Sequence, residues 1–170
     1  GGKTTHIAEL MENKGKVISC DLYPHKLELI NESCKRLSID IVETLHIDGR
    51  DLWKRFNNEA DRVLVDAPCS GLGVLAKRAD SRWRRSPGEI DELHELQVQL
   101  LLSASKCLKS NGILVYSTCT IEPKENEGTI EEFLRKEPGF RLVNESKPFI
   151  KFLPHIHGTD GFFIACMQKL

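Results

Sequence analysis

Two cysteines stand where apolar segments end, and their side chains could do nucleophilic chemistry. Cys69 lies in the segment VDAPCSGLG (65–73), shortly after Asp66, and Cys119 lies in LVYSTCT (114–120). Carbon 5 of cytosine is a poor nucleophile, but a thiolate that adds to carbon 6 makes carbon 5 enamine-like and able to attack an electrophilic methyl group. Two thiols beside a nucleoside-type cofactor would suit that reaction. For Cys69, a packing role, a metal site and a redox role are the alternatives.

The other cysteines and the histidines give no sign of a metal site. None of the six cysteines forms a C-x-x-C pair, so the usual signatures of zinc fingers and thioredoxin-like proteins are absent. The six histidines show no metal-like spacing with a second type of ligand. We therefore expect no bound metal, and we expect four cysteines in apolar periodic segments to be small core residues: Cys20, Cys34, Cys107 and Cys166.

The composition is typical of a soluble globular protein. The chain has 170 residues, of which 40% are hydrophobic and 29% charged, and this is enough for one domain with a substantial core. No apolar run approaches the roughly 18 residues that span a bilayer, and no leader peptide is visible near the start. The net charge of -1 means that any surface for nucleic acid must be a local patch. We expect a cytoplasmic monomer without a membrane part.

Helical and extended patterns alternate along the chain. Expected helices cover residues 4–13, a segment that starts at Pro24, residues 90–108 and 124–136; expected strands cover 16–20, 41–47, 62–66, 112–118 and 161–168; a loop covers 67–88. The core-facing positions are expected to be Leu27, Ile30, Cys34 and Leu37 in the second helix, and Ile90, Leu93, Leu96, Leu100, Leu101, Ala104 and Leu108 in the long one. This alternation predicts an α/β fold with a mostly parallel, Rossmann-like sheet and helices on both faces.

Three of the expected strands end in an aspartate. These residues are Asp21, Asp48 and Asp66. In parallel sheets of this kind, ligands bind in the crevice beyond the carboxyl ends of the strands. Aspartate also caps helices and begins turns, but three in successive strands predict carboxylates that converge on one ligand.

The chain begins with GGKT (1–4), a Gly-rich turn that leads into the first expected helix. A P-loop would need a further glycine five positions earlier, outside this chain, and one magnesium-binding acidic strand end rather than three. A dinucleotide-type turn fits better, because an acid about 20 positions further on, here Asp21, would bind ribose hydroxyls. NAD, FAD and S-adenosylmethionine enzymes share this geometry. We expect that the chain is truncated inside this motif and that the first strand precedes it.

Six short motifs together resemble a known family. They are GGKT, DGRD, VDAPCSGLG, LVYSTCT, PKENE and DGFF. In this order they are similar to the motifs of the Sun/Nop2 family of RNA cytosine-5 methyltransferases, and in particular to its bacterial branch, which modifies 16S ribosomal RNA. The resemblance covers nearly the whole chain. It implies an S-adenosylmethionine-dependent methyltransferase sheet with an antiparallel last strand, an RNA substrate, and a separate N-terminal RNA-binding domain outside residues 1–170, which would form the catalytic domain.

The resemblance also implies which residues bind the cofactor S-adenosylmethionine. Gly1, Gly2 and Lys3 would be the tail of the cofactor loop. Asp21 would bind the cofactor ribose, and Asp48 would lie by the adenine.

The same resemblance assigns the chemistry to three residues. Cys119 would be the nucleophile, and Cys69 would assist release of the covalent product by helping to remove the proton on carbon 5. Asp66 would face both the methionine end of the cofactor and the target base. DNA cytosine-5 enzymes place their nucleophile at the Pro-Cys position instead, so the cysteine in STCT is what favours RNA.

A basic segment follows the Cys69 loop. KRADSRWRR (77–85) is expected to bind RNA through phosphate contacts and base stacking, and the residues concerned are Lys77, Arg78, Arg82, Trp83, Arg84 and Arg85. A merely solvated loop is the alternative. PHIHGTDGFF (154–163) resembles a loop on the substrate side.

Three other functions stay open from the sequence. They are the same chemistry on transfer RNA, a non-catalytic RNA-binding fragment, and a P-loop nucleotide hydrolase.

Overall fold

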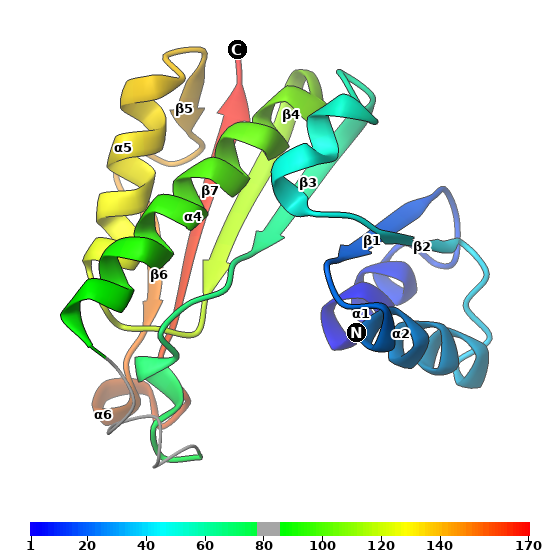
Figure 1. Ribbon diagram of the computed structural model, residues 1–170, viewed down its shortest axis with the longest axis horizontal. Coiled ribbons are helices and arrows are strands. Elements are labelled where there is room, and N and C mark those ends of the chain that lie inside the picture. Colours follow the sequence, from blue (N-terminus) through cyan, green and yellow to red (C-terminus); the bar gives the residue numbers. More distant parts are fainter. Residues whose placement is uncertain (78–85) are drawn as a thin grey trace. The chain divides into compact units, whose positions relative to one another are not determined.

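The computed structural model describes residues 1–77 and 86–170 of the chain. The chain divides into two compact units, Gly1–Leu52 and Trp53–Leu170, and the strands of each unit form a sheet of their own (Figure 1). Within the described ranges, no helix is long and apolar enough to cross a membrane.

The first unit consists of two helices and two parallel strands. Its elements are α1 (Gly2–Leu10), β1 (Val17–Asp21), α2 (Pro24–Arg36) and β2 (Val42–His46), and the 3₁₀ turn η1 (Gly49–Lys54) follows. Val17 of β1 lies opposite Val42 of β2, and Asp21 lies opposite His46. The carboxyl ends of both strands therefore lie side by side, which is where a ligand of such a sheet is bound.

Helix α2 packs on this strand pair through an apolar face. It begins at Pro24, whose fixed φ suits the first turn of a helix. Leu27, Ile30 and Cys34 are buried, as the spacing predicted. The prediction for Leu37 was wrong, because the helix ends at Arg36 and Leu37 is its cap, with 37% of its surface exposed.

The second unit has a mixed sheet of five strands. Their bounds are β3 (Ala60–Asp66), β4 (Leu108–Thr118), β5 (Phe140–Leu142), β6 (Phe149–Phe152) and β7 (Phe162–Lys169). The order is β3-β4-β7-β5, with β6 also paired to β7. β3 and β4 are parallel, and β7 runs antiparallel to β4, so the antiparallel last strand is confirmed. The short strands β5 and β6, both antiparallel to β7, were not predicted.

Helices α4 (Pro87–Cys107) and α5 (Thr129–Lys136) cover one face of this sheet (Figure 1). Residues 53–77 and 86–170 of this unit also contain the 3₁₀ turn η2 (Leu72–Val74), the π-helical turn η3 (Lys124–Gly128) and the short helix α6 (Pro154–His157). The core between sheet and helices contains the following buried side chains: Ala67, Leu101, Ala104, Leu108, Leu114, Tyr116, Ile130, Phe133, Phe140, Phe163, Ala165 and Met167. Burial of each large apolar side chain contributes roughly 1.5–3 kcal/mol.

The long helix α4 buries a partly different face from the one predicted. Leu101 and Ala104 are buried as expected, whereas the predicted positions from Ile90 to Leu100 are only half-buried. Leu108 is also buried, but the helix ends at Cys107 and Leu108 is the first residue of β4, so its predicted place in the helix was wrong. Two residues of α4 that were not predicted to face inward, Gln97 and Val98, are 0% and 1% exposed. A buried glutamine needs hydrogen-bond partners, and its partners lie at the candidate active site.

Candidate active site

The two predicted cysteines lie next to each other. β3 and β4 run parallel with Asp66 opposite Ser117, so the loops that follow the two strands leave from the same end of the sheet. In these loops the sulfur of Cys69 lies 3.3 Å from the sulfur of Cys119. All six cysteines are thiols, so this contact is a hydrogen bond between two sulfurs.

The environment of Cys69 keeps its proton in place. The hydrogen bond with Cys119 and, second, burial raise the pKa of the Cys69 thiol above its ordinary value. Either sulfur can be the donor while both groups are thiols, and a protonated Cys69 can donate to Cys119 once Cys119 is a thiolate. A donor at this distance stabilises negative charge on the accepting sulfur, which is the charge that an attacking thiolate carries.

Asp66 occupies the carboxyl end of β3 beside this thiol pair. Its carboxylate oxygen Oδ1 accepts a hydrogen bond from Oγ of Ser117, at 2.9 Å. The backbone N–H of Ala67 donates to the carbonyl of Ser117 at 3.0 Å. Strand pairing and a side-chain bond thus hold Asp66 at the point where the Cys69 loop begins.

Two glycines let three loops approach closely around Cys119. The N–H of Gly73 donates to the carbonyl of Cys119 at 3.0 Å, and the N–H of Gly161 donates to the carbonyl of Gly73 at 2.8 Å. A Cβ atom at Gly73 would lie 2.7 Å from the Cys119 carbonyl oxygen and closer still to that of Gly161. The motifs VDAPCSGLG and DGFF therefore contain glycine where two backbones touch.

The buried carboxylate of Glu125 joins the two cysteine loops. Glu125 is 0% exposed, and its oxygen Oε1 accepts from the N–H of Ser70 at 2.8 Å and from Nε2 of Gln97 at 3.0 Å. Its other oxygen, Oε2, accepts from Oγ of Ser70. That same Oγ lies 2.8 Å from Oγ1 of Thr120. Gln97 also donates to the carbonyl of Pro68 at 2.9 Å, which fixes the residue just before Cys69.

The neighbouring Asn126 fastens the Cys119 loop to β4. Its Oδ1 accepts from Oγ1 of Thr118 at 2.6 Å, and its Nδ2 donates to the carbonyl of Thr120 at 3.0 Å. Glu125 and Asn126 point inward together because η3 is a π-helical turn, a rare geometry that recurs at functional sites. The motif PKENE, to which no individual role was predicted, thus supports both cysteine loops.

Sequence reasoning missed the residues that support the thiols. Glu125 and Asn126 were expected on a polar helix, and Gln97 was not among the positions expected to face the core. The available signal was the motif PKENE itself, since an acidic and an amide residue that follow two cysteine loops in a family pattern are candidates for a buried network.

The residues predicted to hold the cofactor lie in the first unit. Gly1, Gly2 and Lys3 form the start of α1. Asp21 ends β1, and its Oδ1 accepts from the N–H of Tyr23 at 2.9 Å. Asp48 follows β2. Hydrogen bonds from the side chain and from the backbone N–H of Arg50 lower the pKa of the Asp48 carboxyl.

Asp66 belongs to the second unit, and its convergence with Asp21 and Asp48 stays a prediction. Lys77 is the one RNA-site residue of the prediction that lies in the described part of the chain. Its ammonium lies 2.6 Å from Oδ2 of Asp160, which links the end of the Cys69 loop to the loop before β7. The rest of the predicted set lies outside the described residues: Arg78, Arg82, Trp83, Arg84 and Arg85. Over residues 1–77 and 86–170, no group of three or more potential ligands among His, Cys, Asp and Glu could hold a metal ion.

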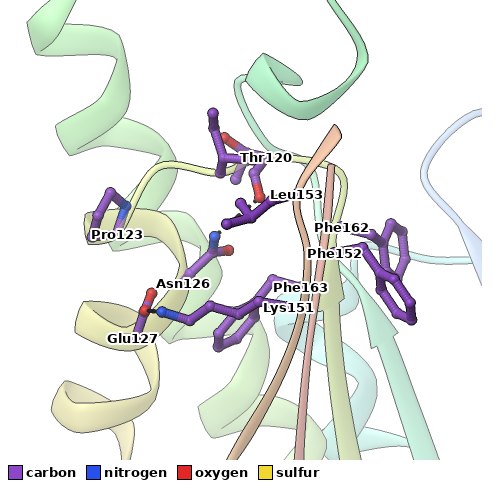
Figure 2. A pocket seen from close by; sticks show the side chains of 10 residues that line it. Thr120, Pro123, Asn126, Glu127, Lys151, Phe152, Leu153, Phe162 and Phe163 are labelled. Atoms are coloured by element: carbon purple, nitrogen blue, oxygen red, sulfur yellow. Dashed lines mark hydrogen bonds and ion pairs between the residues drawn. The ribbon is translucent and has the colours of Figure 1, made fainter. Parts of the chain in front are cut away.

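A pocket of about 120 Å³ lies beside the Cys119 loop (Figure 2). It is lined by Thr120, Ile121, Pro123, Asn126, Glu127, Lys151, Phe152, Leu153, Phe162 and Phe163. In Figure 2, Lys151 of β6 reaches across to Glu127 of η3, with which it forms an ion pair. Thr120 and Asn126 belong both to this pocket and to the network under the thiols.

Solved structures share the fold of this chain. NSun6 from Pyrococcus horikoshii, crystallised with the S-adenosylmethionine analogue SFG, superposes with a TM-score of 0.88 at 39% identity, over 99% of this chain and 45% of that one. A methyltransferase homologue from the same organism gives 0.86 at 31% identity, over 100% and 58%. The fold is thus that of a Rossmann-like methyltransferase, as predicted.

Residues 1–168 match the family described as "16S rRNA methyltransferase RsmB/F", and the chain belongs to this family. This confirms the resemblance found in the sequence. A Bacillus subtilis protein named "Probable ribosomal RNA small subunit methyltransferase B" is 43% identical over 99% of this chain. The "tRNA (cytosine(72)-C(5))-methyltransferase" of Pyrococcus horikoshii is 39% identical over 100%. The chain spans 41% and 45% of the length of these two relatives.

Proposed function

We propose that the chain is the catalytic domain of an S-adenosylmethionine-dependent RNA methyltransferase that modifies carbon 5 of a cytosine in ribosomal RNA through a covalent cysteine adduct. The observation that carries this proposal is the contact of 3.3 Å between the Cys69 and Cys119 sulfurs. Family membership supports the reaction class, and the name of the Bacillus subtilis relative supports ribosomal RNA of the small subunit.

The residues of the first unit fit an adenosine-containing cofactor. Asp21 presents a carboxylate that is 27% exposed, as the binding of two ribose hydroxyls requires. Leu22 and Tyr23, beside it, are 49% and 51% exposed, and they offer apolar surface to a base. Gly1 and Gly2 would bring the backbone close to the cofactor. When bound, S-adenosylmethionine would supply the electrophilic methyl group, and the broken sulfur–methyl bond would leave neutral S-adenosylhomocysteine.

Cys119 is the nucleophile of the proposed mechanism. Its thiolate forms a bond to carbon 6 of the cytosine, and the electron pair of the 5,6 double bond becomes available at carbon 5, which takes the methyl group. Cys69, which keeps its proton at rest, donates a hydrogen bond to the attacking sulfur. Removal of the carbon 5 proton then restores the double bond and breaks the bond between carbon 6 and Cys119.

Cys69 can assist this last step because its environment changes during the reaction. The main cause of its raised pKa is the hydrogen bond with Cys119. Once the Cys119 sulfur is bonded to carbon 6, it carries no negative charge, and that cause is removed. Cys69 can then lose its proton to water and accept the one from carbon 5. Asp66, held by Ser117 at the start of the same loop, is proposed to orient the target base and the methionine end of the cofactor.

RNA binding is proposed for the basic segment that follows the Cys69 loop, together with a separate N-terminal domain. In support, the two sequence relatives are more than twice as long as this chain. We further propose that residues 1–170 act as one catalytic domain of a monomeric, cytoplasmic enzyme. Transfer RNA is the second candidate substrate, since the Pyrococcus horikoshii relative is named for it.

Methyl transfer to defined RNA tests the proposal. The full-length protein is incubated with labelled S-adenosylmethionine and either unmodified 16S ribosomal RNA or a transfer RNA transcript. We expect 5-methylcytosine in the ribosomal RNA, and none with Cys119→Ala. Label in transfer RNA alone would favour the second candidate, and label in neither RNA, with tight RNA binding, would indicate a non-catalytic RNA-binding protein.

A further inference from the structure

The residues that directly follow the two cysteines form a hydrogen bond with each other. Ser70 follows Cys69, Thr120 follows Cys119, and their hydroxyl oxygens are 2.8 Å apart. Both side chains are buried, at 0% and 1% exposure. The contact of the sulfurs is thus repeated one residue further along each loop, where it is shielded from water.

The directions of these hydrogen bonds follow from the carboxylate of Glu125. Three donors converge on it, namely the N–H and Oγ of Ser70 and Nε2 of Gln97, as an ionised carboxylate in a buried site requires. Because Ser70 gives its only hydroxyl proton to this carboxylate, Thr120 must donate to Ser70. Thr120 in turn accepts from the N–H of Glu122 at 3.2 Å.

The chain of donors therefore has one arrangement. It runs from the backbone after the Cys119 loop, through both hydroxyls, to a single buried charge. Charge-assisted hydrogen bonds are shorter and stronger than neutral ones, and a buried network of this kind that is satisfied at each member rigidifies its surroundings. Asn126 adds a second anchor, because its amide holds the carbonyl of Thr120 at 3.0 Å and lies beside Thr120 in Figure 2.

We propose that Glu125 is a positioning residue of the thiol pair: through the hydroxyls of Ser70 and Thr120, its carboxylate sets the distance between Cys69 and Cys119. This inference rests on the proposed function, in which the two sulfurs must act on one base. Glu125 touches no reacting atom and acts only through the residues after each cysteine. The inference gives the buried acid of the motif PKENE a task in catalysis that core packing alone does not require.

The test compares a variant of Thr120 that lacks the hydroxyl group with one that keeps it. Thr120→Val keeps the shape of the side chain and removes the donor to Ser70, whereas Thr120→Ser keeps the donor. The measured quantity is the equilibrium constant for disulfide formation between Cys69 and Cys119 in the full-length protein, in glutathione redox buffers, with the bridge quantified by peptide mapping. In this exchange one glutathione disulfide is reduced to two thiols while the two cysteine thiols are oxidised to one disulfide.

We expect this constant to fall at least about tenfold in Thr120→Val, the loss that corresponds to one strong hydrogen bond, and to return with Thr120→Ser. Ser70→Ala, which breaks the same chain from the other loop, should show the same fall if Thr120→Val does not fold. Phe140→Leu is the control, because Phe140 is a core residue outside the hydrogen-bond network of Glu125. This variant should lower the melting temperature but leave the equilibrium constant unchanged. kcat for methyl transfer should fall with the constant, while KM for S-adenosylmethionine stays as in the wild type.

The redox measurement needs neither RNA nor cofactor, so it separates the positioning role from the proposed reaction. Equal constants in the wild type, Thr120→Val and Ser70→Ala would overturn the inference, even if methyl transfer proceeds as proposed. If the equilibrium constants of the wild type and the variants differ as expected but the wild type methylates no RNA, the proposed function is contradicted and the positioning role of Glu125 is still supported.

Discussion

Replacement of Gly73 by alanine tests whether close packing of the loops positions Cys119. The added Cβ would lie 2.7 Å from the Cys119 carbonyl oxygen, where ordinary contact begins at 3.4 Å. That oxygen would have to move by about 0.7 Å, and the carbonyl of Gly161 by more, because both are backbone atoms that cannot rotate away. Gly73 is not among the glycines of the described residues that have a positive φ, so the effect is steric and not conformational.

The expected magnitude follows from the cost of overpacking. Forced insertion of a methyl group into a well-packed site costs roughly 1–3 kcal/mol, which for a chain of this size corresponds to a melting temperature lower by roughly 2–12 °C. A displacement of the nucleophile approaching 1 Å can reduce the rate by about a hundredfold. We therefore expect kcat for methyl transfer to fall between tenfold and a hundredfold, more than the modest loss of stability would produce at 25 °C.

Thermal melts and single-turnover methyl transfer measure the two effects. Gly139→Ala is the matched control, because a Cβ there meets nothing within 4 Å, and both quantities should stay as in the wild type. Gly73→Ala with a wild-type rate would refute the idea that contact between these loops positions Cys119, whatever its melting temperature.

Two further predictions concern the cofactor and RNA. Asp21→Ala should weaken binding of S-adenosylmethionine more than about tenfold, since a carboxylate that accepts hydrogen bonds from ribose hydroxyls makes charge-assisted bonds of roughly 1.5–3 kcal/mol. Calorimetry measures the affinity, and Glu28→Ala, which removes an exposed carboxylate of α2, is the control. Equal affinities of Asp21→Ala and this control would remove Asp21 from the site. The triple variant of Arg82, Arg84 and Arg85 to alanine should reduce the slope of log affinity for RNA against log salt by roughly 0.7–0.9 for each arginine that neutralises a phosphate in the wild type. Filter binding at several salt concentrations measures this slope. An unchanged slope would show that these arginines are only solvated.

The parts of the site that depend on strand order could be predicted from the sequence. Cys69 and Cys119 each follow a strand end, and neighbouring parallel strands bring such ends together. Their juxtaposition therefore required only that β3 and β4 pair, which the alternation of helices and strands indicated.

The supporting network could not be predicted from local patterns. Periodicity assigns polar residues of a helix to its solvent face, and Gln97 and Glu125 are polar residues whose burial depends on donors far along the chain. Ser70, for example, is separated from Glu125 by 55 positions. The strands β5 and β6 have three and four residues, too few for a period of two to be recognised.

The contact between Gly73 and Gly161 shows the same limit. A glycine in a loop is usually explained by a turn, and the sequence alone does not show that another backbone lies against it. Only the pairing of β7 with β4, which places the loop before β7 beside the Cys119 loop, makes the need for glycine visible.

Trapping of a covalent adduct would reveal the separate roles of the two thiols. Full-length Cys69→Ala, incubated with 16S ribosomal RNA and S-adenosylmethionine, should give a retarded protein–RNA band on a denaturing gel, because the bond formed by Cys119 is no longer released. The double variant that also carries Cys119→Ala should give no such band. A band that persists in the double variant would contradict Cys119 as the nucleophile, and no band with normal turnover in Cys69→Ala would contradict the role of Cys69 in release.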